Sequence, residues 1–115
     1  QDFEIWNFDK VTGIFSSLQT ISTYGNQVFD VNFSPDATRL YVCKNYSLYQ
    51  YDLTAPNISA SEILIASSSD GNHITTRIGP DGKLYVNRNN QGWLAVINNP
   101  NAWDLLVVMF QMELI

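Results

Sequence analysis

A short phrase occurs twice in this chain and limits the folds available to it more than any other feature. Phe33 to Val42 reads FSPDATRLYV, and Ile78 to Val86 reads IGPDGKLYV, one residue shorter. The prolines of the two copies, Pro35 and Pro80, lie 45 residues apart. A pattern that returns at a spacing of about 20 to 50 residues is typical of repeated supersecondary units. The sequence therefore predicts successive copies of one small unit.

The residues around the first copy predict strands. Phe29, Val31 and Phe33 alternate with polar residues, so they share one face of an extended chain. Pro35 and Asp36 favour a turn, because proline presets φ and the aspartate side chain can accept a hydrogen bond from a nearby amide. Three more short apolar or aromatic segments follow, each bounded by turn residues: 39–43, 48–53 and 62–67. We expect four antiparallel strands in chain order.

The same order of segments appears before and after this unit. Ile74, Thr76 and Ile78 take the places of Phe29, Val31 and Phe33, and IWNFD at 5–9 matches LYQYD at 48–52 with a spacing of 43. The expected organisation is a partial unit over 1–24 that holds the last two strands, a full unit over 25–70, and a second unit over 71–115 with an atypical apolar tail.

Four short strands in a unit of about 45 residues are typical of a β-propeller blade. The predicted fold class is therefore all-β, with two to two-and-a-half four-stranded antiparallel blades as a fragment or as part of an assembly. A β-sandwich, or another meander with two unrelated Pro-Asp hairpins, is the alternative. Propellers close with about four to eight blades, so the end blades here would expose apolar residues such as Trp6, Phe8, Trp93 and Val96. Exposed apolar faces drive association, and we expect the isolated chain to self-associate.

The tail is the least regular part of the sequence. After Asn101 the chain reads AWDLLVVMFQMELI, and Leu105 to Phe110 form an unbroken apolar run. A buried fourth strand is the prediction. There are two alternatives. The tail could form a short helix at the edge of the last unit, or residues 102–115 could differ from the native continuation of the chain.

Composition narrows the classes of partner. The hydrophobic share of 45% with 15% charged residues is that of a globular chain. The net charge is −5 and the six Lys and Arg residues form no cluster, which argues against a nucleic-acid partner. No apolar run approaches the roughly 18 residues of a membrane span, and the first residues, QDFEIWNFD, do not have the pattern of a signal peptide.

Three residues are candidates for binding. His73, the single histidine, stands in DGNH before a predicted strand; Arg88 lies in the polar hairpin 87–91, and Trp93 lies near a strand end. Aromatic rings stack on sugars and anchor protein interfaces, and Tyr24, Tyr46 and Trp103 share this property. There is a structural alternative for each candidate. His73 would be a loop residue without a function, the hairpin that holds Arg88 would be a solvated turn, and the aromatic rings would pack between blades.

No catalytic residue, metal site or cofactor is predicted. The segment 67–72, SSSDGN, lacks the spaced acids of a dedicated calcium loop. Cys43 is expected to be a small core residue. The four aspartates that follow predicted strands or prolines are explained as turn or cap residues: Asp9, Asp36, Asp52 and Asp81.

Several of these segments together resemble a known family. VFDVNFSPDATRLYV, LYQYDL, GPDGKLYV and INNPN, between about Ile5 and Asn101, are similar to the propeller region of large surface proteins of gliding bacteria, which carry a C-terminal gliding-motility-associated sorting domain. FSPD followed by LYV is also found in WD40-like and lactonase-like propellers. The resemblance implies an exported or cell-surface location and a non-enzymatic scaffold that binds a protein or a glycan. A fragment of a lactonase-like enzyme, with its active-site residues in other blades, is the alternative. The tail after INNPN departs from the family's pattern.

Overall fold

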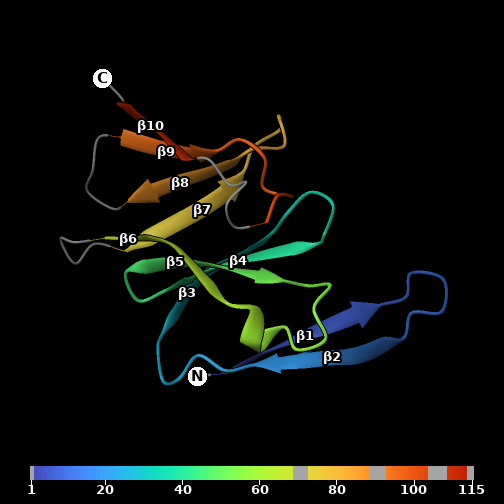
Figure 1. Ribbon diagram of the computed structural model, residues 1–115. Coiled ribbons are helices and arrows are strands. Elements are labelled where there is room, and N and C mark those ends of the chain that lie inside the picture. Colours follow the sequence, from blue (N-terminus) through green and yellow to red (C-terminus); the bar gives the residue numbers. More distant parts are fainter. Residues whose placement is uncertain (1, 69–72, 89–92, 104–108, 114–115) are drawn as a thin grey trace.

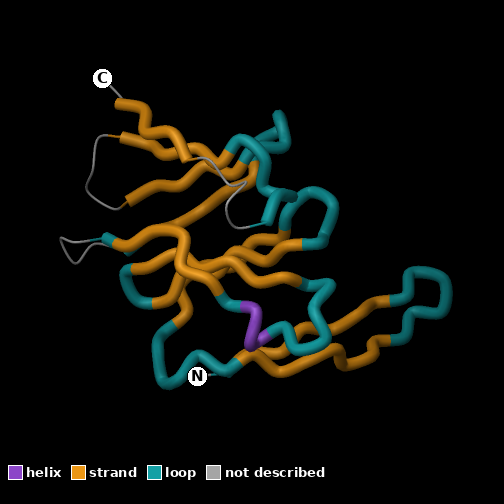
Figure 2. The backbone as a smooth tube through the Cα atoms, viewed as in Figure 1, coloured by secondary structure: helices purple, strands orange, loops and turns teal. Residues whose placement is uncertain are grey.

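Strands dominate the chain, as the alternating pattern predicted. The computed structural model describes residues 2–68, 73–88, 93–103 and 109–113 of the 115-residue sequence. The described elements are β1 (Phe3–Phe8), β2 (Phe15–Ile21), β3 (Val28–Phe33), β4 (Arg39–Lys44), β5 (Ser47–Asp52), η1 (Ser59–Ser61), β6 (Ile63–Ser67), β7 (Ile74–Ile78), β8 (Leu84–Arg88), β9 (Trp93–Ile97) and β10 (Met109–Glu113). Figure 2 shows the short helical turn η1 in the connection between β5 and β6. The expectation of an all-β chain with antiparallel sheets is confirmed.

The strands form three antiparallel sheets (Figure 1). We call β1–β2 the hairpin sheet, β3–β4–β5–β6 the middle sheet and β7–β8–β9–β10 the last sheet. Within each sheet, strands that are consecutive in the chain are neighbours, so each is a simple meander. In Figure 1 the middle sheet lies between the other two. None of these sheets, as far as the structure describes them, closes on itself.

Strand β4 explains why the middle sheet is at the centre. Leu40 and Val42 point toward the hairpin sheet, whereas Tyr41 and Cys43 point toward the last sheet, and all four are buried. A strand covered on both faces needs a continuous apolar sequence rather than an alternating one. The run LYVC meets that need.

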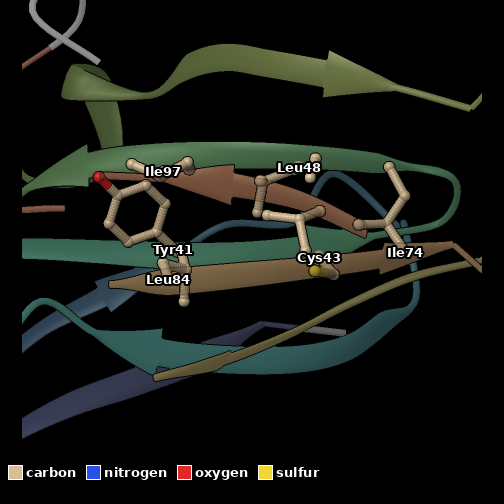
Figure 3. Packing of buried hydrophobic residues seen from close by; sticks show 8 residues of the cluster. Tyr41, Cys43, Leu48, Ile74, Leu84 and Ile97 are labelled. Atoms are coloured by element: carbon tan, nitrogen blue, oxygen red, sulfur yellow. The ribbon is translucent and has the colours of Figure 1, made fainter. Parts of the chain in front are cut away.

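The sheets enclose two separate cores. Between the hairpin sheet and the middle sheet lie Ile5, Ile21, Leu40, Val42, Tyr51 and Ile58. Between the middle sheet and the last sheet lie Tyr41, Cys43, Leu48, Ile74, Leu84, Val86, Ala95 and Ile97. Figure 3 shows this second core, with side chains from β4 and β5 meeting side chains from β7, β8 and β9. Burial of these apolar side chains holds the three sheets together.

Two strand pairs carry an irregularity at matching places. The register of β1 against β2 shifts between Ile5 and Trp6, and the register of β5 against β6 shifts between Leu48 and Tyr49. These positions are 43 residues apart, the spacing at which IWNFD matches LYQYD. A bulge bends a strand and increases its twist. The hairpins β1–β2 and β5–β6 therefore share this irregularity as well as the sequence match of their first strands.

The four aspartates lie at turns, as predicted. Each carboxylate accepts a hydrogen bond from the backbone N–H two residues further on: Asp9 from Val11 (2.8 Å), Asp36 from Thr38 (3.0 Å), Asp52 from Thr54 (2.9 Å) and Asp81 from Lys83 (3.1 Å). The side-chain hydroxyl of Thr38 and its amide hold the pKa of Asp36 below its usual value. The backbone amides of Val11 and Thr12 have the same effect on the pKa of Asp9. Each of these carboxylates therefore stabilises a turn by accepting backbone hydrogen bonds.

The two Pro-Asp turns give a prediction about backbone strain. Ala37 has φ of 61° and Gly82, at the matching place, has φ of 77°. A left-handed conformation costs a residue with a Cβ about 1–2 kcal/mol, and nothing lies within 4 Å of a Cβ at Gly82. We expect Gly82→Ala to lower the free energy of unfolding by about 1 kcal/mol and Ala37→Gly to raise it by a few tenths, as measured by urea denaturation. Equal stability of Gly82→Ala and the unchanged chain would contradict this.

The tail supplies the fourth strand that the sequence predicted. β10 completes the last sheet and pairs with β9 from Met109 opposite Ile97 to Glu113 opposite Trp93. Residues 105–108 of the predicted strand lie outside the described residues.

The predicted exposed apolar residues are only partly as expected. Trp6 and Phe8 are half-exposed, but Val96 is buried.

Candidate functional site

His73 is part of a cluster of rings. Its imidazole lies 3.9 Å from the ring of Phe29 and 5.1 Å from the ring of Tyr46, between ring centroids. Its Nδ1 lies 3.2 Å from the carbonyl oxygen of Asn45, so the tautomer that carries hydrogen on Nδ1 donates to this oxygen. We call Phe29, Tyr46 and His73 the aromatic cluster. Because Phe29 and Tyr46 remain partly exposed, the cluster presents ring surface to solvent.

The turn between β4 and β5 holds Tyr46 in this position. Asn45 adopts a left-handed conformation, with φ of 51°, which asparagine tolerates better than most residues. Its backbone N–H donates to Gln27 (2.9 Å), its side-chain oxygen accepts from the Gln27 amide (3.2 Å), and its side-chain nitrogen donates to Asn26 (2.8 Å). The turn is thereby tied to the segment that leads into β3.

A row of polar groups joins β3 to β7 and lies next to the cluster. Asp30 accepts hydrogen bonds from the backbone N–H of Thr76 (2.7 Å) and from its hydroxyl (3.3 Å). The side-chain nitrogen of Asn32 donates to the carbonyl of Thr76 (3.0 Å) and to its hydroxyl oxygen (2.7 Å). We call Asp30, Asn32 and Thr76 the polar seam. It fixes the first strands of the middle and last sheets side by side.

A cleft of about 560 Å³ opens beside the polar seam and is lined by Phe29, Asp30, Thr75, Thr76, Arg77, Tyr85 and Asn87. The lining combines two aromatic rings with a guanidinium, an amide, hydroxyls and a carboxylate. Pockets that orient a ligand typically place a few polar groups among apolar ones. Such a surface suits a polar ligand with hydroxyl or amide groups, which the rings can contact by stacking.

The other two candidates lie on the last sheet, whose first strand follows His73. Ile74, the residue after His73, pairs with Arg88, so the backbone of Arg88 lies at the end of the last sheet that His73 enters. Trp93 begins β9 and pairs with Glu113. The side chains of Arg88 and Trp93 lie outside the described part of the chain.

Sequence reasoning identified His73 and Tyr46 separately but did not bring them together. His73 follows Tyr46 by 27 positions, with β5 and β6 between them, and no local pattern indicates that the two rings meet. Phe29 was predicted as a strand residue on an apolar face. The bulge between Val28 and Asp30 gives Phe29 a different direction from that of Val31 and Phe33. Trp103, another exposed aromatic candidate, instead lies 5.2 Å from the guanidinium of Arg39.

Cys43 is a core residue, as predicted. It is fully buried in the core between the middle and last sheets. Burial, with a smaller contribution from the charge of Asp30, raises the pKa of its thiol to about 12. A thiol in this state carries almost no thiolate at neutral pH, and the thiolate is the nucleophile.

We therefore expect native Cys43 to resist alkylation by iodoacetamide at pH 8 for hours, while the chain unfolded in guanidinium chloride reacts within minutes. Mass spectrometry of the intact chain gives both rates. Fast alkylation under native conditions would show that the second core opens readily.

The described residues contain neither a cluster of metal-ligand side chains nor a helix that could span a membrane. Among the described residues, no three His, Cys, Asp or Glu side chains gather where they could hold a metal ion. Most of the SSSDGN segment, 69–72, falls outside those residues. Likewise, no described helix has the length and apolar character that crossing a membrane requires.

Comparison of this chain with models of known protein families, with curated proteins and with solved structures gave no match.

Proposed function

We propose that the chain consists of β-propeller blades and serves as a non-enzymatic scaffold or binding module of an exported bacterial surface protein. The observation that carries this proposal is the stacking of the sheets. The middle sheet is covered on one face by the last sheet and, over its β4–β5 half, on the other face by the hairpin sheet. The first strands, β3 and β7, lie side by side across the polar seam. Blades of a propeller pack face to face, with their first strands innermost.

The matched local features support equivalent units. The register shifts opposite Ile5 of β1 and Leu48 of β5 lie 43 residues apart, and the left-handed residues Ala37 and Gly82 lie 45 residues apart. The two members of each pair lie at matching positions of the repeated sequence. A β-sandwich does not require such correspondence, because its two sheets need not be copies of one unit.

The aromatic cluster and the adjoining cleft are the proposed binding surface, and a glycan or a polar loop of another protein is the proposed ligand class. Half-exposed rings beside amide, hydroxyl and guanidinium groups can stack on a sugar ring or on a peptide and still satisfy its polar groups. The location at the cell surface follows from the sequence resemblance alone.

A glycan array probed with the labelled 115-residue chain tests the binding role. We expect at least one bound glycan class, with affinity reduced about tenfold or more by Tyr46→Ala, since removal of a stacking ring costs about 1–2 kcal/mol. Phe15→Ala is the matched control, because Phe15 is an exposed ring on the hairpin sheet, where it contacts Phe8. Binding that Tyr46→Ala leaves unchanged would refute the proposed surface. Absence of any glycan binding would leave a protein as the ligand class.

The isolated chain is also expected to self-associate. Exposed apolar side chains on the hairpin sheet and on β3 form part of its surface, among them Trp6, Phe8, Phe15, Val31 and Phe33. Apolar surface of this kind favours association. Sedimentation velocity between about 10 μM and 1 mM should show the mean mass rising with concentration. A constant monomer mass over that range would contradict the expectation.

A further inference from the structure

The hairpin sheet has an open edge. Strand β5 pairs with β4 on one side and with β6 on the other, whereas β1, which matches β5 in sequence and in the position of the register shift against its partner, pairs with β2. On the other side of β1, no strand among the described residues is its partner. The backbone N–H and C=O groups along that side are a template for a further strand.

An apolar groove runs beside this open edge. It has a volume of about 380 Å³ and is lined by Phe3, Glu4, Ile5, Trp6, Val28, Val31, Phe33 and Leu40. Val31 and Phe33 of β3 are 40% and 50% exposed, although they share a face of the middle sheet with the buried Leu40 and Val42. The hairpin sheet thus covers the β4–β5 half of this face and leaves the β3 half open.

The packing between the other two sheets shows what covers such a face. Thr76 of β7 stands where Val31 stands in β3, 45 residues earlier. Thr76 is only 6% exposed, because Asp30 and Asn32 of β3 lie against it. In that interface the neighbouring sheet includes an inner pair of strands, β3 and β4. The hairpin sheet has no counterpart of this pair among the described residues.

We infer that the groove is a docking site for a β-hairpin built like β3–β4, with its second strand added antiparallel to the open edge of β1. Main-chain hydrogen bonds to β1 supply affinity, and side chains that point into the groove supply specificity. Where β3 has Asp30 and Asn32, the docked strand needs apolar side chains, because it faces Val31 and not the hydroxyl of Thr76. The inference depends on the edge and the groove, and it holds whether or not the assembled sheets close into a ring.

A second copy cannot fill the groove through its own β1. Two antiparallel neighbours in a sheet are related by a two-fold axis perpendicular to that sheet, and a pair of identical strands makes an isologous contact. This symmetry would place the middle sheet of the second copy on the same face as the middle sheet of the first. Both would then need the same space under the joined strands, so a separate hairpin is the occupant that the geometry favours.

The test uses the full 115-residue chain and a synthetic hairpin with the sequence of residues 27–44 carrying Asp30→Val and Asn32→Val. We expect saturable binding by isothermal titration calorimetry. We also expect hydrogen exchange of the amides of 3–8 to slow about tenfold or more on binding, because amides in a new strand pair are protected. The peptide with the unchanged sequence should bind about tenfold more weakly, since it buries two polar side chains against Val31.

Two variants of the protein separate groove binding from non-specific adhesion. Val31→Lys places a charge on the floor of the groove and should abolish binding. Leu64→Lys is the matched control, since Leu64 is 58% exposed on β6, away from the groove, and it should bind as the unchanged chain does. Circular dichroism establishes that both variants are folded.

Three outcomes would overturn the inference. The first is no binding of the apolar hairpin to the folded chain. The second is binding that Val31→Lys leaves intact. The third is protection of the 3–8 amides that rises with protein concentration in the absence of peptide, which would make another copy of the chain the occupant. A loss of glycan binding in Tyr46→Ala bears on the aromatic cluster alone, so the two proposals can fail separately.

Discussion

Replacement of Leu84 by Ala is expected to lower the free energy of unfolding by about 2–5 kcal/mol, the range for truncating a buried leucine. Leu84 is fully buried in the core between the middle and last sheets. The truncation removes several apolar groups from contact and leaves a cavity that both sheets line. Because this core joins the two sheets, we expect them to unfold together in one transition. Thermal and urea denaturation, followed by circular dichroism at low protein concentration, measure the change.

Leu64→Ala is the matched control, as it makes the same chemical change at an exposed position of β6. It should change the free energy of unfolding by less than about 0.5 kcal/mol. If Leu84→Ala were as mild as Leu64→Ala, the middle and last sheets would not share a stabilising core, and the stacking behind the proposed function would be refuted.

Glu62→Gln is expected to lower the free energy of unfolding by about 3 kcal/mol, because it removes the countercharge of a buried lysine. The side chain of Lys44 is 2% exposed, and its ammonium forms an ion pair with Glu62. The hydroxyl of Tyr51 donates to the same carboxylate oxygen, and the ring of Tyr49 lies 4.4 Å from the Lys44 nitrogen. Burial, together with the neighbouring carboxylate, raises the pKa of Tyr51. The Glu62 carboxylate therefore holds both the Lys44 ammonium and the Tyr51 hydroxyl in place.

The double variant Lys44→Met with Glu62→Gln provides the decisive comparison. Replacement of both members of a buried pair by groups of similar shape is often close to neutral, so most of the lost stability should return. Glu4→Gln is the control for a carboxylate at the surface, since Glu4 is exposed and accepts a hydrogen bond from the Trp6 indole (2.9 Å); it should have an effect below about 0.5 kcal/mol. A double variant less stable than Glu62→Gln would show that the charge of Lys44 is tolerated without its partner.

The position of most strands could be predicted from the sequence, and the relations between sheets could not. The alternation around Val31 and the Pro-Asp turns predicted β3, β4 and the antiparallel order of the middle sheet, because side chains alternate faces in any strand. The fourth strand of the last sheet was predicted from the apolar run 105–110, and β10 supplies that strand in the described residues. Its register, with Met109 opposite Ile97 of β9, could not be predicted, because an unbroken apolar run does not indicate which residues pair.

The candidate site shows the same division. The sequence singled out His73 and the aromatic residues as types suited to binding. It gave no sign that Phe29 and Tyr46 contact His73, because these rings come from three segments brought together only when two sheets pack. The polar seam was likewise unpredicted, since Asp30 and Thr76 are 46 positions apart and are joined across two sheets.

What the sequence by itself determined is local: the strand segments, the aspartate turns and the 43- to 45-residue spacing of similar segments. These depend on alternation and turn chemistry, which act over a few residues. Only the tertiary structure decided which face of β4 meets which sheet, which carboxylate neutralises Lys44, and that Val31 borders an open groove. Such facts depend on how sheets stack, and stacking is set by the burial of side chains that are distant in the chain.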